Sequence, residues 1–173
     1  MLQWLQSKIA LIVAGLILIS SLSTIFYIQV SSMERDELKE RCRKISGVIE
    51  HIDNIDADLV RKRISFEEDS KGIFVDPEIK SGSYMVEISE DFVELKSESD
   101  SVRSDLTADI HLWEPEELNR TGDVDVDDLN KRDSLTEPLI FEAGEGDILI
   151  RKLRLSHDRS YRSHIFISRV DDV

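Results

Sequence analysis

The sequence has little cysteine and lacks the short motifs that mark common catalytic centres. Cys42 is the only cysteine among the 173 residues, so an intrachain disulfide is excluded and the fold must depend on its core. The chain contains no G-x-S-x-G, Walker or G-x-G-x-x-G motif, and Gly144 and Gly146 are expected in a hairpin turn. Four histidines fall in no H-x-x-x-H or H-E-x-x-H pattern: His51, His111, His157 and His164. These absences predict a protein that is not an enzyme and that uses no cofactor.

Charge of either sign is absent from Ile9 to Val30, a run of 22 residues. A helix of that length is about 33 Å long, enough to cross a hydrocarbon core of about 30 Å. A cleaved signal peptide also contains an apolar run, but that run is usually about 7–15 residues long and an A-x-A site follows it. This chain has no such site after the run. The sequence therefore predicts an uncleaved single-pass anchor over residues 1–32.

Positive charge is outnumbered, since Asp and Glu number 36 against 22 Lys and Arg, for a net charge of -14. Such a surface repels nucleic acid and anionic lipid, and neither is expected as a ligand of the domain. Alternate carboxylates at Asp123, Asp125 and Asp127 indicate a possible Ca²⁺ site, although the stretch lacks the glycine and glutamate of an EF-hand. A solvated acidic loop is the alternative, and the favoured one.

The residues after the anchor place apolar side chains on one face of a helix. Steps of four and three residues separate the members of this apolar stripe, which are Leu38, Cys42, Ile45, Ile49 and Ile52. No proline separates the anchor from the stripe, so we expect one continuous helix from about Gln3 to Ile55 or Leu59, amphipathic over residues 33–59. A second copy of the helix or the chain's own domain must cover the stripe. The strand-like pattern after the helix favours the domain, with Cys42 as a small core residue.

After the helix the apolar period changes to that of strands. Residues 84–88 and 93–95 carry apolar side chains at alternate positions around Ser89–Asp91, as the strands of a hairpin do. Residues 114–137 are expected to form a long polar loop. Further strands are expected within these stretches: 61–69, 71–79, 101–113, 138–156, with two strands around Ala143–Gly146, and 163–170. The predicted fold is α+β, with the helix packed on a mainly antiparallel β-sheet or β-sandwich domain over residues 60–173.

Two features indicate opposite orientations for this domain. Lys8 and the terminal amine carry the only positive charges before the uncharged run, whereas five come closely after it: Arg35, Lys39, Arg41, Arg43 and Lys44. The positive-inside rule places the domain in the cytoplasm on that count. Asn119 begins an N-glycosylation acceptor pattern, which favours an exported domain. The residues alone leave the orientation open.

The plan of anchor, stripe and sheet resembles that of type IV pilins and pseudopilins. Residues 73–97, followed by "DIHLWEP", are similar to exported pilin-like proteins of archaea, with a turn that uses Pro77, Ile79, Gly82 and Tyr84. The resemblance implies an extracellular C-terminal domain and a structural or interaction role. Prepilins have a glycine just before the apolar run, where this chain has Ser7 and Lys8. The resemblance therefore implies a membrane-retained subunit whose processing at Lys8 and Ile9 is open.

The predicted function is that of an accessory or minor subunit of a surface filament or secretion assembly in the cell membrane. The alternative is a membrane-tethered sensory or ligand-binding module without catalytic activity. The expected partners are the membrane and other protein chains, including further copies that associate through the N-terminal helix. Ala10 and Ala14 form a small-xxx-small pair within the anchor, as do Ser20 and Thr24, and such pairs let helices approach closely in lipid.

Overall fold

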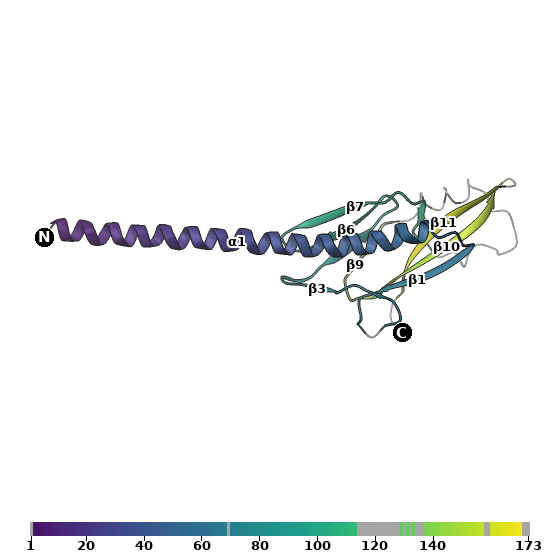
Figure 1. Ribbon diagram of the computed structural model, residues 1–173, viewed down its shortest axis with the longest axis horizontal. Helices are drawn as coiled ribbons and strands as arrows, with labels where there is room; N and C mark the ends of the chain where they lie inside the picture. The colour runs from purple at the N-terminus through teal and green to yellow at the C-terminus, as the bar shows by residue number, and fades with distance from the viewer. Residues whose placement is uncertain are drawn as a thin grey trace.

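A long helix joined to a β-rich domain makes up the structure, a computed structural model (Figure 1). Helix α1 runs from Leu2 to Asp53 without a break. Its amino half projects away from the domain, and the strands gather around its carboxyl half (Figure 1). The structure describes these parts of the chain: residues 2–68, 70–113, 129, 131, 133, 137–157 and 160–170.

A five-stranded sheet is built around the longest hairpin of the domain. Its strands lie in the order β2, β1, β10, β11 and β8. Their bounds are β1 (Leu59–Ser65), β2 (Ile73–Phe74), β8 (Ile110–His111), β10 (Asp147–His157) and β11 (Ser160–Val170). The two outer strands, β2 and β8, pair in parallel with their neighbours, whereas the inner pairs are antiparallel.

A four-stranded antiparallel sheet forms the second layer, in the order β7, β6, β5 and β9. Its strands are β5 (Met85–Ile88), β6 (Phe92–Lys96), β7 (Ser101–Asp105) and β9 (Leu139–Glu142). The predicted hairpin is present, because Val86 pairs with Leu95 across β5 and β6. A small ribbon of β3 (Glu78–Ile79) and β4 (Gly82–Ser83) completes the strands.

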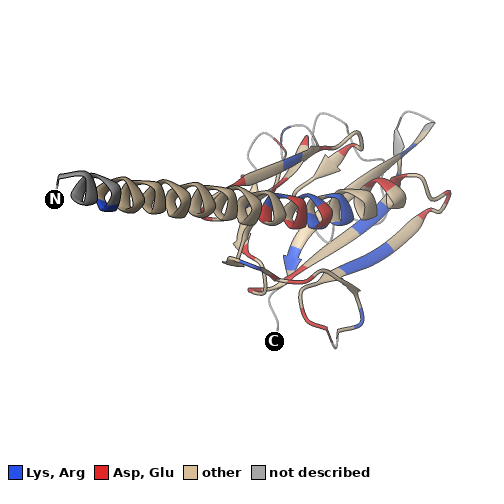
Figure 2. Cartoon of the chain, turned by 60° about the vertical axis from the view of Figure 1, so that its left-hand side comes forward, with Lys and Arg blue, Asp and Glu red and all other residues tan. Residues whose placement is uncertain are grey.

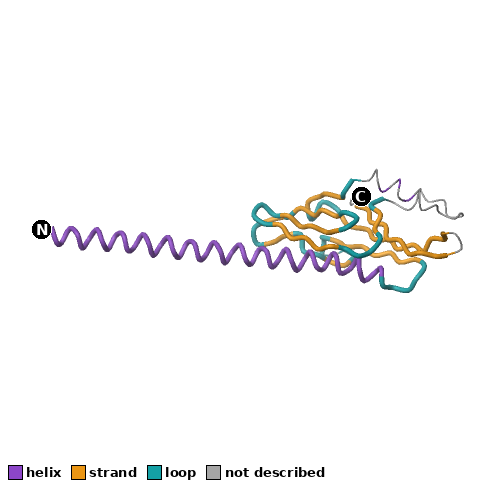
Figure 3. The backbone as a smooth tube through the Cα atoms, turned by 90° about the horizontal axis from the view of Figure 1, so that it is seen from above, coloured by secondary structure: helices purple, strands orange, loops and turns teal. Residues whose placement is uncertain are grey.

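The apolar stripe of α1 lies in the one core that both sheets share. All five side chains of the stripe are at most 1% exposed. The helix contacts β6 and β7 most extensively, and the Cys42 thiol donates to the Val93 carbonyl oxygen at 3.4 Å. Figure 3 shows the strands gathered along one side of this half of the helix. The chain's own domain therefore covers the stripe, and the predicted α+β fold is confirmed.

The helix ends a few residues before the expected end, at Asp53. Lys152 of β10 is only 3% exposed, and its ammonium donates to the carbonyl oxygens of Asp53 at 2.5 Å and Ile55 at 2.8 Å. The last carbonyl groups of a helix lack partners within the helix and carry partial negative charge, so a cation is favoured there. Lys152 thus fixes where the helix stops and where the chain turns into β1.

The glycine-bearing turn at residues 143–146 differs from the expected hairpin. The strand before it, β9, pairs with β5, and the strand after it, β10, pairs with β1 and β11. Gly144 has a φ of 96°, which glycine adopts readily and other residues rarely do. The turn therefore carries the chain from one sheet to the other and closes an edge of the shared core.

Candidate interaction site: the membrane helix and its junction with the domain

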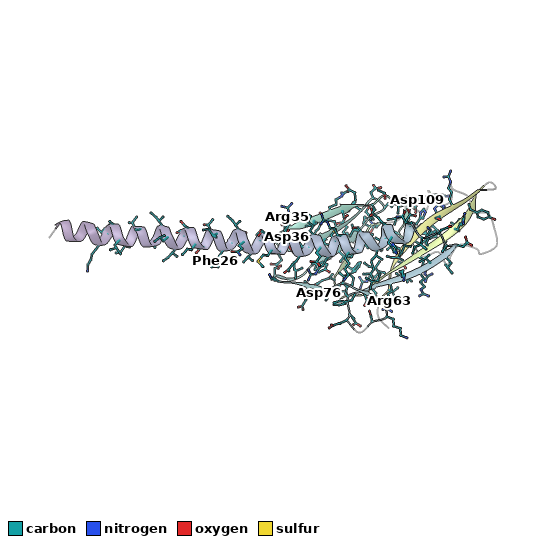
Figure 4. The ribbon with its side chains drawn as sticks, in the orientation of Figure 1. Phe26, Arg35, Asp36, Arg63, Asp76 and Asp109 are labelled. Atoms are coloured by element: carbon teal, nitrogen blue, oxygen red, sulfur yellow. The ribbon has the colours of Figure 1, made fainter. Side chains whose placement is uncertain are left out.

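The amino half of α1 presents apolar side chains on all sides. Among the described residues, one helix is long and apolar enough to cross a membrane, and its apolar window has no buried part. Ile12, Ile17 and Phe26 are 61–65% exposed, and Figure 4 shows Phe26 pointing away from the helix into open space. An apolar surface that extends along a whole helix is rarely left in water. The structure is therefore compatible with membrane anchoring.

The small residues of the anchor lie on this exposed half. Ala10 and Ala14 are exposed, and the domain covers neither of them. The carboxyl half of the helix, in contrast, is already packed on the sheets through its stripe. Self-association through Ala10 and Ala14 stays a prediction, and the stripe is assigned to packing within the chain.

A buried carboxylate marks the junction between the two halves of the helix. Glu34 lies four residues before Leu38, in line with the stripe, and is 4% exposed. Its Oε1 atom accepts hydrogen bonds from the hydroxyl groups of Ser97 at 2.5 Å and Ser99 at 2.8 Å. These bonds, that of Ser97 foremost, outweigh burial and hold the pKa of Glu34 below its ordinary 4.5. The loop after β6 is thereby attached to the helix where the apolar half ends.

Further polar contacts fasten the opposite flank of the helix to the domain. Arg41 donates to the carbonyl oxygens of Asp76 at 3.1 Å and Glu78 at 2.7 Å. The carboxylate of Glu37 accepts from the Lys80 backbone N–H at 3.1 Å and lies 3.5 Å from its ammonium. Figure 2 shows charged residues, coloured red and blue, along this half of α1, after a long stretch without them. The helix and the domain are therefore held together by contacts on two flanks.

Glu34→Gln is expected to remove a pH-dependent part of the domain's stability. Because the folded pKa lies below 4.5, the ionised carboxyl stabilises the fold fully above that value, and this contribution is lost as pH falls through the folded pKa. Urea unfolding at about pH 7 and about pH 3 should show a smaller loss of stability for the variant than for the unaltered chain. Glu40→Gln, at an exposed position, is the matched control and should behave like the unaltered chain.

A cluster that the sequence reasoning missed lies on the outer face of the five-stranded sheet. We call Asp109, His111 and His164 the histidine cluster. The two histidines are 3% and 4% exposed, and the Nε2 atom of His111 lies 2.9 Å from the Nδ1 atom of His164. Asp109 comes directly before β8 and His111 ends it, and this two-residue spacing along extended backbone places them on one face. His164 comes from β11, and only the parallel pairing of β8 with β11 brings it next to His111.

Several carboxylates surround this cluster. Asp133 lies 2.9 Å from the Nδ1 atom of His111, and Asp109 lies 3.4 Å from the Nδ1 atom of His164. The pKa of Glu90 is raised, first by burial and then by the charges of Asp133 and Asp91. The local field therefore favours a cation.

Other predicted site residues lie outside the described residues. These are the possible calcium ligands Asp123, Asp125 and Asp127 and the glycosylation acceptor Asn119. The calcium site and the glycosylation site both stay predictions.

Comparison of the chain with protein-family models, with curated proteins and with solved structures found no match in any of the three. The function has to be inferred from the chain's own geometry.

Proposed function

We propose that the protein is a membrane-anchored, pilin-like structural or interaction protein, with its C-terminal domain outside the cell. Its role is that of an accessory or minor subunit of a surface filament or secretion assembly. The observation that carries this proposal is the unbroken helix from Leu2 to Asp53, bare and apolar in one half and built into a β-domain in the other. Such a rod holds its domain at a fixed distance and angle from the membrane.

The division of the helix also indicates which surface is left for assembly. Since the stripe is buried in the core, contacts between subunits have to use the apolar half or the outer surface of the domain. Within lipid, helices associate through close packing of small residues rather than through the hydrophobic effect. Ala10 and Ala14 supply such a face, so the anchor is the part of the rod that we assign to contacts with other subunits.

Oxidative crosslinking tests this assignment. Ala14→Cys should give a disulfide-linked product with a second copy or with another membrane protein in native membranes. Ile12→Cys is the control, because two residues along a helix correspond to a rotation of about 200° and place the thiol on another face. The native Cys42 does not interfere, since burial raises the pKa of its thiol to about 11. Equal crosslinking at both positions, or none at either, would contradict a specific face.

Thiol labelling in intact cells tests the orientation. Tyr161 lies on β11 and is 66% exposed, so Tyr161→Cys should react with a membrane-impermeant maleimide if the domain is extracellular. The same variant in permeabilised cells shows that the thiol can react at all. Labelling that requires permeabilisation would place the domain in the cytoplasm, as the distribution of Lys and Arg does, and would refute the outward-facing proposal.

A further inference from the structure

We propose that the histidine cluster is a binding site for a divalent transition-metal ion, with Zn²⁺ as the ion that its donors suit. The inference does not rest on the proposed function. It starts from the edge of the five-stranded sheet, where His111 of β8 pairs in parallel with Phe166 of β11. The backbone N–H of Ile165 donates to the Asp109 carbonyl oxygen at 3.1 Å, which fixes the register of the two strands.

The alternation of side chains along these strands separates the cluster from the core. Ile110 and Ile165 point into the shared core. Their neighbours Asp109, His111 and His164 therefore share the opposite face. Figure 4 shows Asp109 on the β-rich domain, well away from the apolar half of α1. The two histidines thus lie on paired strands, and the carbonyl oxygen of Asp109 is bonded to β11.

The distances between the donor atoms approach those of a tetrahedral metal site. One donor atom from each residue can be chosen so that all three lie within 4.8 Å of one another. Ligand atoms at about 2.0–2.1 Å from Zn²⁺ in a tetrahedron are about 3.3–3.4 Å apart. The Nδ1 atom of His164 is 3.4 Å from Asp109 Oδ2, which already matches. The two ring nitrogens at 2.9 Å have to separate by about 0.4 Å, a small side-chain movement.

The two facing ring nitrogens share a single proton in the absence of a metal ion. Asp133 accepts the Nδ1 proton of His111, which leaves the Nε2 lone pair of a neutral His111 directed at His164. The proton between the rings then resides on the Nδ1 atom of His164. A divalent cation takes the place of that proton, which moves to the Nε2 atom of the neutral His164 ring, so two neutral imidazoles bind the ion.

The surroundings of His111 are those of a supported metal ligand. Asp133 orients the ring from behind, as carboxylates do for metal-bound histidines, and itself accepts from the Trp113 indole N–H at 2.9 Å. Phe166 stacks on the His111 ring with centroids 4.9 Å apart. These contacts hold the imidazole in one orientation and tautomer, so little rearrangement is needed when an ion binds.

The choice of metal is determined by the donors and by access. Two imidazole nitrogens and one carboxylate suit Zn²⁺, whereas Ca²⁺ and Mg²⁺ prefer all-oxygen sites. The side chain of Asp109 is 68% exposed, which gives the ion a path from solvent and leaves a fourth position for water. A bound ion would fasten the short edge strand β8 to β11.

Zinc titration of the full-length protein in detergent micelles tests the site. After treatment with a chelator, the protein should bind one equivalent of Zn²⁺ in competition with a chromophoric indicator. His164→Ala should weaken the affinity more than about 100-fold, and Asp133→Asn, which alters a positioning residue, by about 10–100-fold. His51→Ala, at an exposed position on α1, is the matched control and should leave the affinity unchanged. Co²⁺ in the site should give the visible absorption of a tetrahedral complex.

Asp109→Asn keeps the test decisive if a histidine variant fails to fold, because this exposed side chain can change without disturbing the core. This variant should fold, as judged by circular dichroism, and should bind Zn²⁺ at least about tenfold more weakly. The proposal is overturned if the unaltered chain binds no zinc in this assay. It is equally overturned if Asp109→Asn binds zinc as tightly as His51→Ala, since zinc would then be held elsewhere on the acidic surface.

Discussion

Ile45→Ala should lower the free energy of unfolding of the domain by about 2–5 kcal/mol. The side chain is fully buried at the middle of the stripe, between α1 and the sheets. The substitution removes apolar surface from the core and leaves a cavity that a helix fastened on two flanks cannot collapse to fill. Chemical unfolding of the full chain in detergent, followed by near-ultraviolet circular dichroism, measures the difference.

Ile17→Ala is the matched control for this prediction. It makes the same chemical change on the same helix, but Ile17 is 61% exposed in the apolar half, where no strand of the described chain covers it. Its effect on the unfolding of the domain should stay within about 0.5 kcal/mol. Equal effects of the two substitutions would show that the stripe is not part of the core.

The stripe was predictable because its cause is local. Side chains at steps of three and four fall on one face of any helix, and five apolar ones in a row have to be buried. The sequence also favoured the right covering surface, because strands come directly after the helix.

The burial of Glu34 was not predicted, because its cause is not local. Glu34 occupies the next position of the same face, and only the contact with Ser97 and Ser99 explains how a carboxylate can be buried there.

The hairpin of β5 and β6 was predictable, whereas the path after β9 was not. Val86 and Leu95 alternate with their neighbours on either side of a short turn, and pairing between adjacent strands is the most frequent arrangement. Gly144 marks a turn in either topology, since a positive φ serves a hairpin as well as a crossing between sheets. The packing of β10 against β1 decides between them, and it is a contact between residues far apart in the chain.

The histidine cluster was invisible for the same reason. Metal-site motifs work when two or more ligands lie within one turn of a helix or one tight loop. Here His111 and His164 come from different strands, and a parallel pairing at the edge of the sheet brings them together. Asp109 and His111 provide only a two-residue spacing, which occurs often by chance. Long-range pairing of short edge strands is therefore the step at which inference from the sequence stopped.

Removal of residues 1–30 should convert the protein from a membrane-bound to a water-soluble form. Thirteen of the residues from Ile9 to Val30 are Leu, Ile, Val or Phe. At about 0.3–0.6 kcal/mol each they favour insertion by about 4–8 kcal/mol, and their removal abolishes this contribution. The remaining helix still carries the whole stripe, from Leu38 to Ile52, and none of the side chains that the structure describes between Lys8 and Val30 is buried. The shortened chain should therefore keep its fold, as judged by circular dichroism, and stay in the supernatant when membranes are sedimented.

The oligomeric state of the shortened chain distinguishes the two possible covers of the stripe. A stripe that pairs with a second helix would make the soluble form a dimer, as in a coiled coil. Packing of Leu38, Ile45 and Ile52 on the chain's own sheets leaves no such seam, so light scattering after size-exclusion chromatography should give the mass of one chain. A dimer that Ile45→Asp dissociates into folded monomers would contradict this packing. A monomer that Ile45→Asp unfolds would confirm it, because a charge at this position has no partner in the core.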